Sequence, residues 1–196
     1  MLLLLLINLA WSGPSASVLA GFEPRLLTIT GNDQTLDEYG FAPVHSSFLP
    51  SWGLRGRVDQ ENGWTTTMAM SYGIAVRPDD GKPVPTTTNQ VLVGFGPGHM
   101  LGSRGHIGAV FGFATLGHTV GSSVQGGALT YLGPYIEPRG SFRVVDGPGV
   151  IELSAAVLTH LPVGRPHSQI LWEEDFRRPV IGGLSISIHA GPAVGP

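Results

Sequence analysis

The sequence contains no cysteine among its 196 residues, and charged residues are scarce, at 13% of the chain. Without cysteine, the chain has no disulfide framework, no thiolate nucleophile and no cysteine-based metal site. In ordinary soluble domains about a quarter of the residues are charged, so the small share of charged residues here is itself unusual. The formal net charge of −3 gives no reason to expect nucleic-acid binding.

Long apolar runs are also missing: beyond the first residues, none approaches the roughly 20 residues that a membrane helix needs. No segment shows a 3.6-residue period with helix caps, so we expect little helix. The 29 glycines and 16 prolines could indicate disorder, but 42% hydrophobic residues and a mean hydropathy of +0.18 argue against it. We expect one folded domain, and a barrel if the chain spans a membrane.

The first residues show the pattern of a secretory signal peptide. An apolar stretch from Met1 to Ile7 is followed by small and turn-forming residues from Ser12 to Ser17. We predict a signal peptide over residues 1–17, cut after Ser17 or as late as Ala20. No Lys or Arg precedes Arg25, so the basic segment of such peptides is missing. The alternative is a buried N-terminal strand or helix.

The remaining chain divides into eight segments with a period of two, separated by turn residues. They cover residues 17–30, 51–59, 63–76, 89–100, 106–120, 127–144, 150–163 and 179–191. Long connections alternate with tight turns, which places the long loops at one end of an up-and-down meander. We therefore predict a barrel domain over residues 18–191, with a short tail at 192–196.

The two faces of each segment differ in the size of their side chains. In the third segment Trp64, Met68 and Tyr72 alternate with small residues such as Ala69 and Gly73. A soluble barrel would cover its outer face with charge. A membrane barrel turns its bulky apolar groups outward and keeps small or mutually paired polar groups in its narrow interior. The sequence favours the second arrangement.

Charges within the segments fall on the face opposite the bulky residues, and we predict that they form a lumen network. Charges inside a narrow barrel must pair, because an isolated buried ion costs several kcal/mol. The predicted members are Glu23, Arg25, Arg55, Arg57, Asp59 and Glu152. The sixth segment conflicts with this pattern, because Glu137 and Arg139 share their face with Tyr131 and Tyr135. A bulge near one of its prolines would resolve the conflict.

Alternation, loop order, leader and interior charges together resemble the small eight-stranded outer-membrane barrels of Gram-negative bacteria, over roughly residues 17–191. The resemblance implies an all-β fold: a single up-and-down antiparallel transmembrane barrel of about eight strands. It also implies location in the cell outer membrane, contact with outer-membrane lipid, and a monomer. A secreted or periplasmic soluble barrel or sandwich is the alternative.

Two functions stay open at this stage. Glu152, Ser154 and His160 share one interior face and could form an acyl-transfer site, which would make the chain a lipid-modifying hydrolase. The same residues also fit a plain polar network. The seven histidines show no metal-ligand spacing, so no metal and no cofactor are expected.

The last long connection mixes aromatic residues with charges of both signs, a composition suited to recognition. We predict that Trp172, Glu173, Glu174 and Phe176 contribute to it. A solvated loop with an aromatic at the membrane interface is an equal alternative. The favoured function is a non-enzymatic barrel with a closed, polar-plugged lumen, which anchors itself or presents its loops to an extracellular ligand or protein.

Overall fold

The computed structural model describes residues 15–31, 46–77, 86–121, 126–164, 167–168 and 178–194. In these ranges no helix is long and apolar enough to cross a membrane. The strands are β1 (Ser15–Phe22), β2 (Arg25–Thr30), β3 (Ser46–Leu49), β4 (Ser51–Asp59), β5 (Trp64–Arg77), β6 (Thr86–Leu101), β7 (Gly105–Gly121), β8 (Gly126–Val145), β9 (Gly149–His160), β10 (His167–Ser168) and β11 (Val180–Val194).

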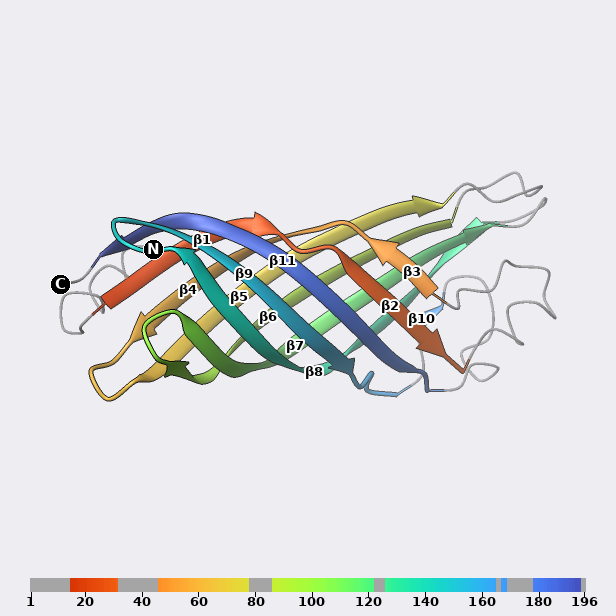
Figure 1. The fold of residues 1–196 in the computed structure, drawn as a ribbon. Helices are drawn as coiled ribbons and strands as arrows, with labels where there is room; N and C mark the ends of the chain where they lie inside the picture. Colours follow the sequence, from red (N-terminus) through yellow and green to blue (C-terminus); the bar gives the residue numbers. More distant parts are fainter. Residues whose placement is uncertain are drawn as a thin grey trace.

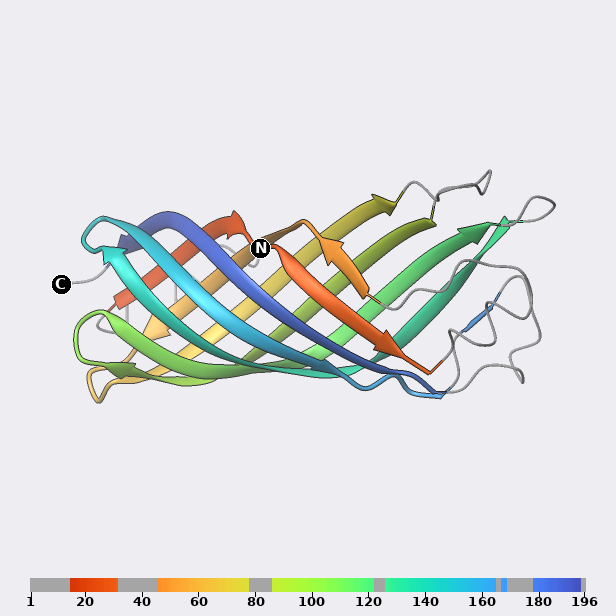
Figure 2. The ribbon, with the colours of Figure 1, turned by 45° about the vertical axis from the view of Figure 1, so that its right-hand side comes forward.

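These strands form one antiparallel sheet that closes on itself. From β4 to β9 each strand pairs with the next one in the chain, and β9 pairs with β11. The sheet closes through β1, which pairs with both β4 and β11, and through β2, which pairs with β11 and β3. Ala16 lies opposite Val58 on one side and opposite Val194 on the other. Figures 1 and 2 show the strands wrapping around a common axis to which all of them are tilted. The predicted up-and-down barrel is therefore confirmed.

The number of barrel strands is eight, because two of them are interrupted by proline. β1 and β2 are halves of one strand, and β3 and β4 are halves of the next, since both halves keep one register. In that register Pro24 and Pro50 fall opposite each other, and proline has no N–H to donate. Just beside them the Glu23 N–H donates to the Ser51 carbonyl at 2.7 Å. The two-residue strand β10 pairs only with β8.

Most strands lie within a few residues of the predicted segments, but β3 and β10 lie outside them and β9 ends three residues before the predicted end. The sheet also reaches further at both ends of the chain. β1 begins at Ser15, and β11 continues to Val194, past the predicted end of the barrel at residue 191. Pro192 is opposite Gly149, and the Ala193 N–H donates to the Pro148 carbonyl at 3.0 Å. Proline is tolerated here because it sits near the end of its strand. Three of the five residues predicted as a tail thus belong to β11.

Three tight turns lie at one end of the barrel, which we call the turn end. They join β4 to β5, β6 to β7, and β8 to β9, and the other end is called the loop end (Figure 1). Each turn contains a glycine with positive φ: 80° at Gly63, 68° at Gly102 and 133° at Gly147. Glycine adopts this conformation without the clash that a Cβ would cause.

The conflict in the sixth segment disappears because its tyrosines point inward. Tyr131 and Tyr135 are buried in the lumen together with Glu137 and Arg139. β8 pairs with β7 without a register break along its length, and the irregularity against β9 lies between Arg143 and Val145. No bulge near the prolines is needed, since both tyrosines and both charges belong to one interior face.

The interior has two unlike halves. The turn-end half carries most of the charged side chains, whereas the loop-end half is filled by large apolar ones. The latter include Leu27, Ile29, Leu49, Leu116, Leu129, Tyr131, Leu158 and Ile181. The sequence predicted small or polar interior residues throughout. The loop-end half differs from that prediction, because its interior side chains are large and apolar. Alternation could not reveal it, because successive residues such as Leu26 and Leu27 place leucine on both faces.

The outward face of the strands is apolar and uncharged. Among the strand side chains that the structure describes, none of those pointing outward is Asp, Glu, Lys or Arg. On β5 the outward residues from Trp64 to Val76 are apolar apart from Thr66. With tilted strands they cover about 30 Å along the barrel axis, enough for the roughly 25 Å apolar band of an outer-membrane barrel. This surface fits lipid and is unsuited to water.

Candidate functional site

The lumen network is the densest group of ionisable residues in the described part of the chain. Its members come from β1–β2, β4, β8 and β9, where each charged residue alternates with an outward apolar one. Strand geometry alone sends every second side chain inward, so the charges are carried into the lumen with no special local structure. Glu23, Arg25, Arg55, Arg57, Asp59 and Glu152 are all at most 8% exposed.

Glu23 is the centre of the network. Its carboxylate lies 2.7 Å from Arg25 Nη2 and 2.5 Å from Arg55 Nη2. The His189 ring reaches it from β11, with Nε2 at 3.0 Å from Oε1. Arg139 Nη1 lies 3.6 Å away. One carboxylate thus joins groups from four strands across the lumen.

A second cluster lies toward the turn end. Arg57 donates to Glu152 with 2.6 Å between Nη1 and Oε2, and its Nε lies 2.9 Å from Asp59 Oδ1. Arg143 Nη2 donates to Asp59 Oδ2 at 2.5 Å. Arg55 Nη1, 3.5 Å from Glu152 Oε1, connects this cluster to the one around Glu23. The structure therefore brings all six predicted network residues together.

Besides His189, four further residues that the sequence prediction did not include join the network: Glu137, Arg139, Gln90 and Arg143. Glu137 pairs with Arg139 and lies 3.4 Å from Arg25 Nη2. Gln90 accepts a hydrogen bond from Arg25 at 3.1 Å, and Arg143 bonds to Asp59. The signal for Glu137 and Arg139 was present, since they share one face. It was obscured by the tyrosines of the same face, which were expected to point outward.

The three residues considered for acyl transfer are not assembled as a catalytic group. Ser154 Oγ hydrogen-bonds to Arg55 Nη1 at 2.8 Å and to Ser187 Oγ at 2.6 Å, and Glu152 pairs with two arginines. His160 is six residues further along β9, about 20 Å away at the usual strand rise. Neither ring nitrogen of His160 makes a hydrogen bond. A general base must reach its nucleophile within hydrogen-bond distance, and His160 does not reach Ser154.

Two other buried histidines, His106 and His118, lie next to hydroxyl groups. His106 Nε2 lies 2.8 Å from Thr65 Oγ1, and His118 Nδ1 lies 3.0 Å from Thr88 Oγ1. Within the described ranges, no group of three or more His, Cys, Asp or Glu side chains could hold a metal ion. The predicted recognition residues Trp172, Glu173, Glu174 and Phe176 lie outside the described residues.

Comparison with solved structures identifies the fold. With a TM-score of 0.65 and 10% identity, the chain matches Ail, the attachment invasion locus protein of Yersinia pestis, over 93% of this chain and 99% of that chain. The structure of Ail in complex with the heparin analogue sucrose octasulfate matches with a TM-score of 0.61 and 11% identity, over the same shares of the two chains. Neisserial surface protein A matches with a TM-score of 0.53 and 8% identity, over 90% of this chain and 98% of that chain. No family model matches the sequence, and no curated protein matches it.

This is the fold of the small outer-membrane barrels of Gram-negative bacteria, as the sequence predicted. The uncharged outward face described above is that of a barrel embedded in the outer membrane. Eight strands enclose a lumen about wide enough for its own side chains. Here those side chains are an ion-pair network and an apolar cluster.

Proposed function

We propose that the protein is a non-enzymatic outer-membrane barrel that holds itself closed and presents its loop end to an extracellular partner. The observation that carries this proposal is the lumen network. Its arginines and carboxylates form ion pairs with one another across the barrel, and the apolar cluster fills the loop-end half of the lumen. Such an interior supports a rigid scaffold rather than a route for solutes.

The long connections at the loop end carry an acidic composition. The segments 32–45, 78–85, 122–125 and 165–177 contain eight acidic residues and three basic ones. The acidic residues are Asp33, Asp37, Glu38, Asp79, Asp80, Glu173, Glu174 and Asp175, and the basic ones are Lys82, Arg165 and Arg177. We infer that the partner presents basic groups, because complementary charge steers association.

The structural neighbour Ail has been crystallised with a heparin analogue, a polyanion. The acidic loop composition of this chain makes the same ligand a poor fit, since like charges repel. A partner with a basic surface and an exposed apolar patch for Trp172 and Phe176 suits the loop sequence better.

Binding of the folded barrel, held in lipid nanodiscs, to a basic protein surface tests this proposal. Immobilised histones and immobilised heparin serve as the two probes. We expect histone binding that weakens as salt rises and is lost on deletion of residues 169–177, with no heparin binding. Equal histone binding by the deletion variant, or preference for heparin, would contradict it.

The absence of catalysis is tested separately. Membranes that contain the wild type and His160→Ala should show the same lipid A and phospholipid profiles. A lipid product that disappears in the variant would establish the hydrolase alternative. A closed lumen further predicts no stable conductance when the barrel is inserted into planar bilayers.

A further inference from the structure

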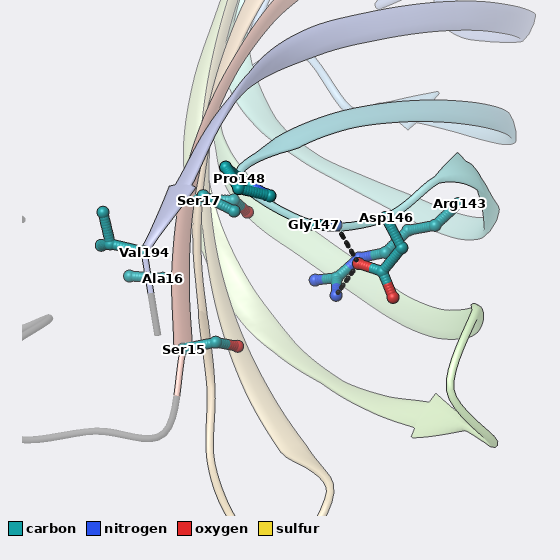
Figure 3. Close-up of a pocket in the computed structure, with 9 residues that line it drawn as sticks. Ser15, Ala16, Ser17, Arg143, Asp146, Gly147, Pro148 and Val194 are labelled. Atoms are coloured by element: carbon teal, nitrogen blue, oxygen red, sulfur yellow. Dashed lines mark hydrogen bonds and ion pairs between the residues drawn. The ribbon is translucent and has the colours of Figure 1, made fainter. Parts of the chain in front are cut away.

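A cavity of about 630 Å³ opens at the turn end of the barrel. It lies between the start of β1, the turn that joins β8 to β9, and the end of β11 (Figure 3). In an outer-membrane barrel the short turns face the periplasm. This cavity, which we call the mouth cavity, is therefore on the opposite side of the membrane from the loops.

Its polar groups include side chains that are buried and incompletely bonded. Ser17 is 4% exposed, and its Oγ, which makes no hydrogen bond, points into the cavity (Figure 3). Arg143 is 8% exposed, and its Nε makes no hydrogen bond. Ser15 Oγ also faces the cavity and donates to Asp59 Oδ2 at 3.2 Å. Buried polar groups normally have partners, so Ser17 Oγ and Arg143 Nε have hydrogen-bonding capacity that no protein group uses.

One of the two carboxylates that Arg143 contacts is held weakly. Arg143 Nη2 bonds to Asp59 at 2.5 Å, but its Nη1 lies 3.6 Å from Asp146 Oδ1, beyond a normal hydrogen bond. The Asp146 side chain is 40% exposed, and it also accepts the Gly147 N–H at 3.2 Å. An incoming carboxylate could replace Asp146 at both donors without burying an additional unpaired charge.

We propose that the mouth cavity binds the free C-terminal carboxylate of a short peptide. Arg143, the Ser17 hydroxyl and the Gly147 N–H would donate to that carboxylate. A doubly charged anion such as phosphate fits less well, because Asp59 and Asp146 stand beside the one arginine. The volume exceeds that of a small inorganic ion and leaves room for a peptide residue beside the carboxylate.

The probe is N-acetyl-alanyl-alanine, compared with its C-terminal amide, and binding to the full barrel in nanodiscs is followed by calorimetry. We expect the amide and Arg143→Gln each to weaken binding about tenfold or more, as for loss of a charge-assisted hydrogen bond. Arg104→Gln, a change at an exposed turn residue of the same end, is the matched control and should bind normally.

Asp146→Asn gives a change of opposite sign. Removing the internal competitor should strengthen binding of the peptide, and this exposed side chain can be replaced without disturbing the fold. The variant keeps the proposal testable even if Arg143→Gln fails to fold. Equal binding of acid and amide, unchanged binding by a folded Arg143→Gln, or weaker binding by Asp146→Asn would each overturn it.

Such peptide ends occur in cell-wall stem peptides and in periplasmic proteins, and the same assay separates them. Binding of soluble stem-peptide fragments, strengthened by Asp146→Asn, would assign the cell wall as the source. Binding only of peptides copied from protein C-termini would assign a protein. Binding of inorganic phosphate as tightly as the peptide would contradict the site. Deleting residues 169–177 should change none of these results, because that segment belongs to the loop end.

Discussion

At the scale of single residues, Glu23 connects side chains of several strands across the lumen. It contacts Arg25, Arg55, Arg139 and His189. Its neighbours on the outward face, Phe22 and Pro24, have no part in this. Because several cations share this carboxylate, its negative charge helps to neutralise all of them.

Glu23→Gln should therefore destabilise the barrel by about 3–5 kcal/mol, because it leaves buried guanidinium groups without their counter-ion. The measurement is the urea midpoint of unfolding in lipid vesicles. Glu61→Gln, the same substitution at an exposed turn residue, should change stability by no more than about 0.5 kcal/mol. Equal midpoints for the two variants would remove the network from the account of stability.

Position 53 has no room for a side chain, because the Glu23 side chain lies against Gly53. A Cβ added at Gly53 would lie 2.7 Å from Glu23 Cδ and 3.1 Å from His189 Nε2. We expect Gly53→Ala to cost about 1–3 kcal/mol through overpacking. Gly140 on β8 is the control, since nothing lies within 4 Å of an added Cβ there. A Gly53→Ala barrel as stable as Gly140→Ala would show that the carboxylate can move aside.

Charged residues were predictable from the sequence wherever their strand had one bulky and one polar face. Arg55 and Arg57 alternate with Trp52 and Leu54, so their inward direction could be read directly. His189 could not be assigned in this way, because its contact with Glu23 depends on the closure between β1 and β11. Alternation along a strand shows which face a residue lies on, but it does not show which residue it contacts across the lumen.

At the scale of elements, the start of β1 bears on where the leader ends. Ser15, Ala16 and Ser17 pair with Asp59, Val58 and Arg57 of β4. A cut after Ser17 would remove this part of the ladder, and a cut after Ala20 would leave only two residues of β1. A cut before Ser15 would leave the whole of β1 in the mature chain.

We propose that the leader is cut before Ser15, and the small-x-small pattern Ala10-Trp11-Ser12 offers a site after Ser12. The intact mass of protein purified from outer membranes should then correspond to a chain that begins at Gly13. Ser12→Arg should block this cleavage. A mature chain that begins at Val18 or Gly21 would refute the proposal.

The sequence predicted the strands well but not the two interruptions at Pro24 and Pro50. Each proline lies inside or beside an alternating segment, and alternation continues through it. Whether two prolines fall on the same rung depends on the register between strands, which the sequence of one strand does not contain. The loop-end apolar cluster escaped prediction for a related reason, since its residues meet only when the barrel closes.

At the scale of the whole molecule, the outward face decides which solvent the barrel tolerates. Ile186 lies near the middle of β11 and is 72% exposed. In lipid vesicles Ile186→Arg should lower the free energy of unfolding by about 2–4 kcal/mol, the cost of a cation near the bilayer midplane. Gln60→Arg, at an exposed turn residue, should have little effect. A stable Ile186→Arg barrel in lipid would mean that this face does not contact the hydrocarbon.

The pairing of β1 with β11 also makes closure of the barrel depend on both ends of the described chain. The first and last strands of the barrel come from opposite ends of the described chain, so the sheet keeps two open edges until β1 and β11 pair. Open strand edges recruit other strands and promote aggregation. A chain that closes its sheet only by pairing strands from its two ends exposes both edges before closure, and it depends on being protected from self-association until then.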